Sequence, residues 1–157
     1  PVIAGASTND TRHSLSLAKG AQDMGADALL IITPYYNKAN RTGLKAHFKA
    51  IADAVDLPII LYNVPSRTGV NIAPDLVAEL ANECKNIVAI KEASGDIAQV
   101  AEVARLVPDD FAIYSGNDDS ITPLLSLGGS GVISVLANVC PRQTHDLFSC
   151  KILRRWC

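Results

Sequence analysis

The sequence has few aromatic residues and no surplus of charge of either sign. Phe, Trp and Tyr make up 5% of its 157 residues, whereas hydrophobic residues make up 48%. This balance favours an α/β protein rich in Ala, Val, Ile and Leu over an aromatic-rich binding surface. The formal net charge is −2, with both signs mixed along the chain. Because there is no basic patch or arm, the sequence predicts binding neither to nucleic acid nor to an anionic membrane.

Long hydrophobic runs and paired cysteines are also missing. The longest apolar run lies around 28–32 and is far too short to span a bilayer, and we expect no signal peptide. Cys84, Cys140, Cys150 and Cys157 form no C-x-x-C pair and have no His at metal-ligand spacing. We therefore expect reduced thiols in a cytoplasmic protein without a metal, with a disulfide or a zinc site as the less favoured alternatives.

What the chain does contain is an alternation of strand and helix patterns. Short apolar runs predict strands over Val2–Gly5, Ala28–Thr33, Leu57–Asn63, Ile87–Ala93, Phe111–Gly116 and Val132–Leu136. Between them, apolar residues at helical spacing predict helices, including one from Pro74 to about Asn82, one capped by Asp96 and one after Pro141. This alternation predicts parallel strands with right-handed crossovers in one α/β domain.

Two architectures fit this alternation, an open doubly wound sheet and part of a (β/α)8 barrel. The length suits the open sheet, because a complete barrel usually needs about 250 residues. Polar residues, however, gather at the carboxyl ends of successive predicted strands: Tyr35–Asn37, Tyr62–Asn63, Lys91–Glu92 and Ser115–Asn117. Functional groups at the same end of consecutive strands favour a barrel mouth, since an open sheet reverses direction and spreads its loops along an edge.

The stretch I-V-A-I-K-E-A-S (Ile87–Ser94) is an apolar strand that ends in a lysine. Burying an ammonium group without a partner costs several kcal/mol, so Lys91 needs a partner or a function. A free amine in a partly dry pocket can attack a carbonyl carbon. From this stretch alone, the alternatives are that Lys91 pairs with Glu92 or extends to water, which are the commoner arrangements at a strand end.

Three motifs in a fixed order resemble the dihydrodipicolinate synthase family. They are T-P-Y-Y-N-K (Thr33–Lys38), Y-N-V-P-S-R-T-G (Tyr62–Gly69) and I-K-E-A-S-G (Ile90–Gly95), and the similarity runs from residue 1 to about 144. The family belongs to the class I aldolase superfamily together with N-acetylneuraminate lyase. The resemblance implies a (β/α)8 TIM barrel and a cytoplasmic lyase of lysine (diaminopimelate) biosynthesis that uses no cofactor.

The resemblance also implies a mechanism and an assembly. Lys91 would form a Schiff base with pyruvate, and the enamine would attack L-aspartate-4-semialdehyde to give 4-hydroxy-tetrahydrodipicolinate. Tyr62 matches the family's proton-donating tyrosine, and Tyr36 matches a tyrosine that enters a neighbouring subunit's site, which implies a homo-oligomer, either a dimer or a tetramer of dimers. By residue type alone, Tyr62 could equally be a packed aromatic, and Tyr35 and Tyr36 an interface feature.

Further residues match substrate-binding positions of the family. Arg67 matches the arginine that receives the carboxylate of the aldehyde, and Gly116 and Ile133 match positions that line the pyruvate pocket. The alternatives are a solvated loop arginine, a turn glycine and a core isoleucine. Sialic acid lyases lack the R-T-G continuation, so Arg67 favours the semialdehyde over the alternative of another pyruvate-dependent lyase that acts on a sugar acid.

Three residues match the region of a lysine feedback site at the family's dimer interface. Asn9 and Tyr35 match two of its residues, whereas His13 lies where inhibited members tend to carry a carboxylate. The sequence is therefore compatible both with an enzyme that lysine inhibits and with one that it does not inhibit.

The family extends beyond this chain on both sides. It begins two βα units earlier, with a G-T-T-G-E motif in the second, and it ends in a C-terminal helical region. The chain opens on Pro1, and we expect a missing N-terminal part. We thus predict a partial barrel of about six βα units over residues 1–146, followed by a divergent tail over residues 147–157. An inactive barrel fragment is the remaining functional alternative.

Overall fold

The structure, a computed structural model, describes residues 1–149 of the chain. The strands of this part are β1 (Ile3–Gly5), β2 (Ala28–Ile32), β3 (Ile59–Asn63), β4 (Ile87–Glu92), β5 (Ala112–Ser115) and β6 (Gly131–Val132). The α-helices are α1 (Thr11–Asp23), α2 (Arg41–Ala52), α3 (Pro65–Thr68), α4 (Pro74–Glu83), α5 (Ile97–Leu106), α6 (Ile121–Ser126) and α7 (Pro141–Ser149). Two 3₁₀ helices, η1 (Asp118–Ser120) and η2 (Leu136–Asn138), join the later elements. None of the helices within these residues is long and apolar enough to cross a membrane.

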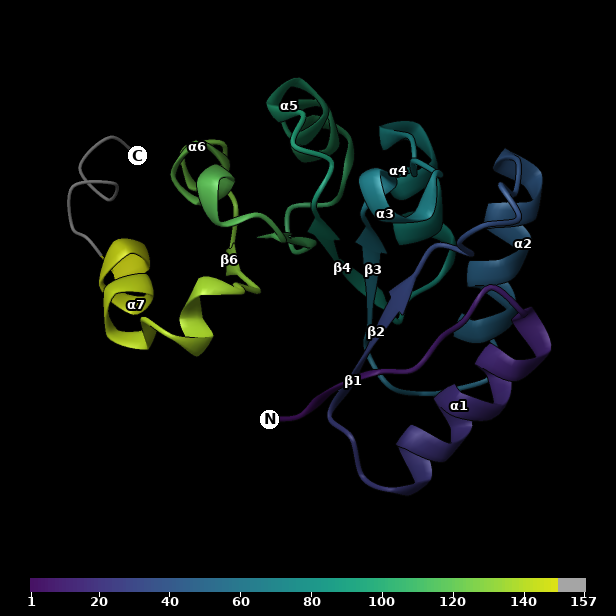
Figure 1. The fold of residues 1–157 in the computed structure, drawn as a ribbon. Helices are drawn as coiled ribbons and strands as arrows, with labels where there is room; N and C mark the ends of the chain where they lie inside the picture. Colours follow the sequence, from purple (N-terminus) through teal and green to yellow (C-terminus); the bar gives the residue numbers. More distant parts are fainter. Residues whose placement is uncertain (150–157) are drawn as a thin grey trace.

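The six strands form one parallel sheet in which the spatial order equals the chain order. The order is β1-β2-β3-β4-β5-β6, and each strand pairs in parallel with the next. A doubly wound sheet would instead reverse its order at a switch point, so the open-sheet alternative is wrong. The crossover helices form an arc around the outside of the strands (Figure 1). The prediction of a partial (β/α)8 barrel is therefore confirmed.

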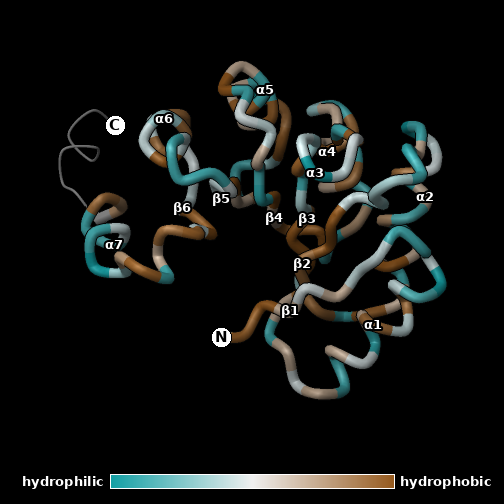
Figure 2. The backbone as a smooth tube through the Cα atoms, in the orientation of Figure 1, coloured by the Kyte–Doolittle hydropathy of each residue, from teal (hydrophilic) through white to brown (hydrophobic). Residues whose placement is uncertain are grey.

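The two faces of the sheet differ in burial. Successive strand residues point to opposite faces, so alternate positions of each strand face the helices. These positions are buried and belong to the main hydrophobic core, as at Leu29, Ile31, Leu61, Ile90 and Ile113. In Figure 2 the central strands are brown, whereas the helices carry both brown and teal segments. The core of this chain thus lies between the strands and the surrounding helices.

The opposite, inner face of the sheet is only partly covered. Its residues near the carboxyl ends of the strands are half-buried: Leu30, Ile32, Tyr62, Lys91 and Tyr114. In a closed barrel this face would be packed by strands from the other side. Among residues 1–149 it is open, and the side chains that the sequence predicts as functional lie along it.

Local sequence signals explain where the helices begin. The side chain of Asp10 accepts a hydrogen bond from the backbone N–H of His13 at the start of α1 (2.7 Å). Asp96 accepts from Ala98 (2.9 Å) and Gln99 (3.2 Å), which confirms it as the predicted cap of α5. A capping residue satisfies backbone donors that the first turn leaves free.

The end of the sheet differs from the prediction. The sequence predicts the sixth strand over Val132–Leu136, but β6 covers Gly131–Val132 and η2 begins at Leu136. The reason is that β5 ends at Ser115, which pairs with Val132, so a longer β6 would have no ladder partner on that side. The helix predicted after Pro141 is confirmed as α7, with proline at its first position.

The predicted boundary between the barrel domain and a divergent tail falls within α7. This helix runs from Pro141 to Ser149 and so passes residue 147 without a break. Residues 150–157, most of the predicted tail, lie outside the described residues. The division at residue 147 therefore stays a prediction.

Candidate active site

Lys91 and Tyr62 meet at the carboxyl end of the sheet. They are direct partners in the register between β3 and β4, so both side chains leave the inner face at the same level. The Nζ atom of Lys91 lies 4.1 Å from the centroid of the Tyr62 ring, well within the range of about 6 Å for a cation–π contact. The amine of Lys91 and the ring of Tyr62 are therefore in contact, and both side chains are half-buried.

Glu92 is not the partner of Lys91, although it follows it in the chain. Glu92 points to the opposite face, where it accepts hydrogen bonds from Asn63, Ser94 and Gln99. Among residues 1–149, Lys91 forms no ion pair. The alternative that Lys91 is paired with Glu92 is therefore wrong, and its amine is not neutralised by a described carboxylate.

Gly116 lies against the stem of Lys91. A Cβ atom at this position would be 2.7 Å from the Cβ of Ala93 and 3.0 Å from the Cε of Lys91, closer than carbon atoms can approach without a shift. The Gly116 N–H donates to the carbonyl of Glu92 (2.8 Å), which fixes this approach. The absence of a side chain at Gly116 therefore provides the space that the aliphatic stem of Lys91 occupies.

Ile133 lies directly after β6 and continues its pairing with β5. Its N–H donates to the carbonyl of Ser115 (2.9 Å), and Ser115 immediately precedes Gly116. Gly116 and Ile133 therefore flank the same strand end, next to the strand that carries Lys91. This arrangement agrees with two walls of one pocket, although their contact with pyruvate stays a prediction.

Arg67 lies on the one-turn helix α3, directly after the strand that carries Tyr62. Pro65 occupies the first position of this helix, and Gly69, with φ 71°, ends it in the left-handed region that favours glycine. The side chain of Arg67 is exposed, and among residues 1–149 it forms no ion pair. Its guanidinium group is therefore available to a carboxylate from outside the chain.

Tyr36 is not brought to Lys91 or Tyr62 within the described part of the chain. It lies on the loop after β2, is 89% exposed and has φ 73°, a conformation that costs a non-glycine residue about 1 kcal/mol or more. Its N–H donates to the carbonyl of Thr68 (3.4 Å), so the loop contacts α3. The phenol of Tyr36 thus extends into solvent, while the hydrogen bond to Thr68 holds its backbone against α3.

The residues matched to a feedback site lie in two adjoining segments. The side-chain amide of Asn37 donates to the carbonyl of Asn9 (3.1 Å), which joins the loop of Tyr35 to the loop before α1. Tyr35 is 38% exposed, and His13 is exposed in the first turn of α1. The loops that carry Asn9 and Tyr35 are therefore adjacent, and His13 lies in the first turn of the helix that follows Asn9.

Potential metal ligands do not cluster in the described residues. Among residues 1–149 there is no group of three or more His, Cys, Asp or Glu side chains that could hold a metal ion. Cys84 and Cys140 are free thiols, and burial raises the pKa of the Cys84 thiol. Cys150 and Cys157 lie outside the described residues.

The sequence pattern places Asn63 and Glu92 among the polar groups of a barrel mouth, but in the structure they form a buried network behind the site. Asn63 and Glu92 are buried on the helix side of β3 and β4, although each directly follows a predicted site residue. Both could have been predicted from one feature of the sequence: each is a polar residue at the end of an apolar strand, one position after a residue that faces the mouth. Strand alternation alone would have placed both in the core, where a polar group needs hydrogen-bond partners.

Comparison with known proteins agrees with this geometry. The family model described as the dihydrodipicolinate synthetase family matches residues 1–151. The 4-hydroxy-tetrahydrodipicolinate synthase of Clostridium perfringens (strain SM101 / Type A) is 62% identical over 147 residues, which are 94% of this chain and 50% of that protein. The chain thus spans about half the length of the curated relatives it matches.

Solved structures extend the similarity to the fold. The dihydrodipicolinate synthase of Thermotoga maritima superposes with a TM-score of 0.92 at 46% identity, covering 99% of this chain and 55% of that one. The enzyme of Acinetobacter baumannii superposes with a TM-score of 0.91 at 46% identity, covering 99% of this chain and 52% of that one. With this match in sequence, fold and strand-end motifs, the chain belongs to the dihydrodipicolinate synthetase family.

Proposed function

We propose that this chain carries the Schiff-base centre of a 4-hydroxy-tetrahydrodipicolinate synthase. The reaction is the condensation of pyruvate with L-aspartate-4-semialdehyde in cytoplasmic lysine (diaminopimelate) biosynthesis. The observation that carries the proposal is the Nζ atom of Lys91, 4.1 Å from the ring centroid of Tyr62 at the carboxyl end of the sheet. The Acinetobacter baumannii relative was crystallised in complex with pyruvate, which supports a keto acid as the first substrate.

The chemistry begins at the amine. The lone pair of Lys91 Nζ attacks the keto carbon of pyruvate; the nitrogen gives up a proton and the carbonyl oxygen takes one up, which gives a carbinolamine. Loss of water gives the imine, and loss of a methyl proton gives the enamine, whose carbon attacks the aldehyde of the second substrate. The phenol of Tyr62, whose ring lies beside this amine, would give and take protons in these steps.

Arg67 is proposed to bind the carboxylate of the aldehyde substrate. Its exposed guanidinium group lies on the segment that follows the Tyr62 strand, and it has no carboxylate partner among residues 1–149. A guanidinium group can form two parallel hydrogen bonds with one carboxylate. Gly116 and Ile133 would line the pyruvate side of the pocket.

Tyr36 and the loop before α1 suggest an assembly. The phenol of Tyr36 is 89% exposed, and the loop that carries it is hydrogen-bonded to α3, so the side chain is available to a neighbouring subunit. We therefore propose a homo-oligomer in which Tyr36 completes another subunit's proton relay. The neighbouring Asn9 and Tyr35, with His13, are the candidate lysine-binding residues at such an interface.

Reductive trapping tests the proposal directly. The chain is incubated with pyruvate and borohydride, digested and analysed by mass spectrometry. We expect Lys91 to gain the mass of one pyruvate, less one water, plus two hydrogens. Lys85 is the matched control, because it is an exposed lysine just before the amino end of the same strand and should stay unmodified. An unmodified Lys91 in a sample shown to be folded by circular dichroism would support the inactive-fragment alternative.

A further inference from the structure

The carboxylate of Glu92 is buried without a cation. The residue is 3% exposed, and among residues 1–149 it forms no ion pair. Its two oxygens accept hydrogen bonds from the side-chain amides of Asn63 (3.1 and 3.0 Å) and Gln99 (3.0 Å) and from the backbone N–H of Ser94 (2.7 Å). Burying a carboxylate costs free energy, and here only neutral donors compensate it. This arrangement indicates that the carboxylate serves to hold its partners in place.

The donors come from separate elements, so the carboxylate joins them. Asn63 ends β3, and its side chain also donates to Asn71 (2.8 Å) and accepts from the N–H of Ile72 (3.0 Å) in the segment before α4. Gln99 lies in the first turn of α5 and exchanges hydrogen bonds with Asn71 (2.7 and 3.2 Å). One carboxylate therefore fastens two strand ends, one helix and one connecting segment.

The network lies one residue beyond the site. Tyr62 pairs with Lys91 in the sheet register, and Asn63 pairs with Glu92 at the next step, on the opposite face. Both strands end at this step, and one residue beyond it the N–H of Ala93 donates to the carbonyl of Asn63 (2.8 Å). The backbone carbonyl of Glu92 also accepts from the N–H of Gly116 (2.8 Å), the residue packed against the Lys91 stem.

We propose that Glu92 is a positioning residue for the Lys91–Tyr62 pair. Its carboxylate fixes the last paired step of β3 and β4, and thereby sets the spacing between the amine and the phenol and keeps Gly116 against the lysine stem. This inference rests on the proposed function. A displacement of about 1 Å at a reacting group can lower a rate by about 100-fold, so the effect of losing this clamp should be large.

The test is Glu92→Gln, read by the rate of pyruvate trapping on Lys91. Glutamine has the same shape but one acceptor oxygen, so an amide NH₂ would face the donors of Asn63 or Gln99. We expect a trapping rate at saturating pyruvate about 10- to 100-fold lower, with the half-saturating pyruvate concentration unchanged. The matched control is Glu102→Gln, which removes a carboxylate from the exposed side of α5 and should trap at the original rate.

A structural role alone would give a different result. It would lower the urea midpoint but leave the trapping rate of the folded population unchanged, which would overturn the inference. If Glu92→Gln does not fold, Gln99→Ala removes one half-buried donor, and we expect a slower rate with the fold retained. A rate equal to that of the original chain in this variant would also overturn it. Absence of any adduct in the original chain would overturn the proposed function itself, and this inference with it.

Discussion

At the scale of single residues, the site depends on which face of a strand each side chain leaves. Lys91 and Glu92 are adjacent in sequence, yet one lies beside the ring of Tyr62 and the other in a buried network behind the sheet. The motif I-K-E-A-S therefore places two polar side chains on opposite faces of the sheet. Period-two alternation explains both once the strand is known.

Gly116→Ala tests the space beside Lys91. The added methyl group would lie 2.7 Å from the Cβ of Ala93 and 3.0 Å from the Cε of Lys91. We expect a loss of about 1–3 kcal/mol in the free energy of unfolding and adduct formation slower by about 10-fold or more. Gly20→Ala in α1 is the control, since a Cβ there meets nothing within 4 Å, and it should stabilise the chain by about 0.5–1 kcal/mol. Equal trapping rates for both variants would contradict the proposed role of Gly116.

His47 should make stability depend on pH. It is 3% exposed between α1 and α2, where Nδ1 lies 2.9 Å from Thr11 Oγ1 and Nε2 has no hydrogen-bond partner. Burial lowers the pKa of His47 from its ordinary value of 6.5. The unfolded chain therefore takes up the proton first as the pH falls. This contribution to stability is complete above about pH 6.5 and is lost as the pH falls through the lowered folded value.

Urea unfolding of the chain and of His47→Gln between pH 8 and pH 5 measures this effect. Glutamine can keep the bond to Thr11 but does not titrate. We expect the urea midpoint of the original chain to fall more steeply with decreasing pH than that of the variant. Parallel curves would show that His47 is not the titrating group.

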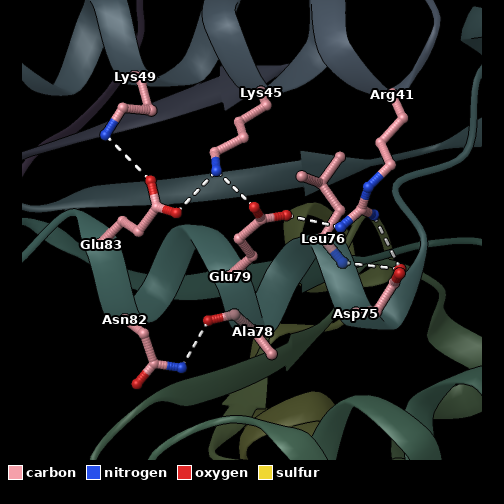
Figure 3. A network of polar contacts seen from close by, with 9 residues as sticks. All are labelled: Arg41, Lys45, Lys49, Asp75, Leu76, Ala78, Glu79, Asn82 and Glu83. Carbon is pink, nitrogen blue, oxygen red and sulfur yellow. Dashed lines mark hydrogen bonds and ion pairs between the residues drawn. The ribbon is translucent and has the colours of Figure 1, made fainter.

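At the scale of elements, a ladder of ion pairs joins α2 to α4. Arg41, Lys45 and Lys49 are spaced four residues apart on α2, opposite Asp75, Glu79 and Glu83 on α4 (Figure 3). Each of the two glutamates contacts two cations, and hydrogen bonds from Lys45 and Lys49 lower the pKa of Glu83. The ladder therefore aligns two neighbouring helices along the outside of the sheet.

Lys45→Gln should weaken this ladder in a salt-dependent way. Lys45 contacts both Glu79 and Glu83, and its hydrogen bonds with them raise its pKa. We expect a lower urea midpoint than in the original chain at low salt, and a smaller difference in about 1 M NaCl, where charges are screened beyond about 3 Å. Lys85→Gln, at an exposed lysine outside the ladder, is the control. The same loss for both variants at both salt concentrations would contradict a specific role of the ladder.

Element prediction from the sequence succeeded where a local pattern decided the outcome. The apolar run at Ile87–Ile90, the cap Asp96 and the proline at Pro74 each appear where expected. It failed at β6, whose length depends on where β5 ends, and gave no signal for α3. The length of β6 depends on a strand distant in sequence, whereas α3 spans only four residues and is too short for a helical period to show.

At the scale of the molecule, the sheet has two unpaired edges in the described residues. β1 pairs only with β2, and β6 only with β5. Apolar side chains are exposed near both, with Val2 at 65%, Ile3 at 46%, Val135 at 72% and Val139 at 76%. The barrel could be predicted because polar residues follow consecutive strands. The exposure of Tyr36 could not, because residue type does not say whether a loop phenol is covered.

The exposed edges predict self-association of the 157-residue chain on its own. Apolar surface beside an unpaired strand favours contact with another chain. We expect the mass from light scattering to rise with protein concentration, and Val139→Lys to reduce that rise. Met24→Lys, at an apolar residue that is 85% exposed at the C-cap of α1 and outside the strands, should have little effect. A monomer at all concentrations would contradict this prediction.

The central claim is that the amine of Lys91 forms an imine with pyruvate beside Tyr62. It is tested most directly by NMR of the chain labelled with ¹⁵N at the lysine side chains and mixed with pyruvate labelled with ¹³C at the keto carbon. We predict a direct ¹³C–¹⁵N bond, detected as a one-bond coupling that disappears in Lys91→Arg and forms more slowly in Tyr62→Phe. A folded chain without this coupling, or a coupling that persists in Lys91→Arg, would contradict the account.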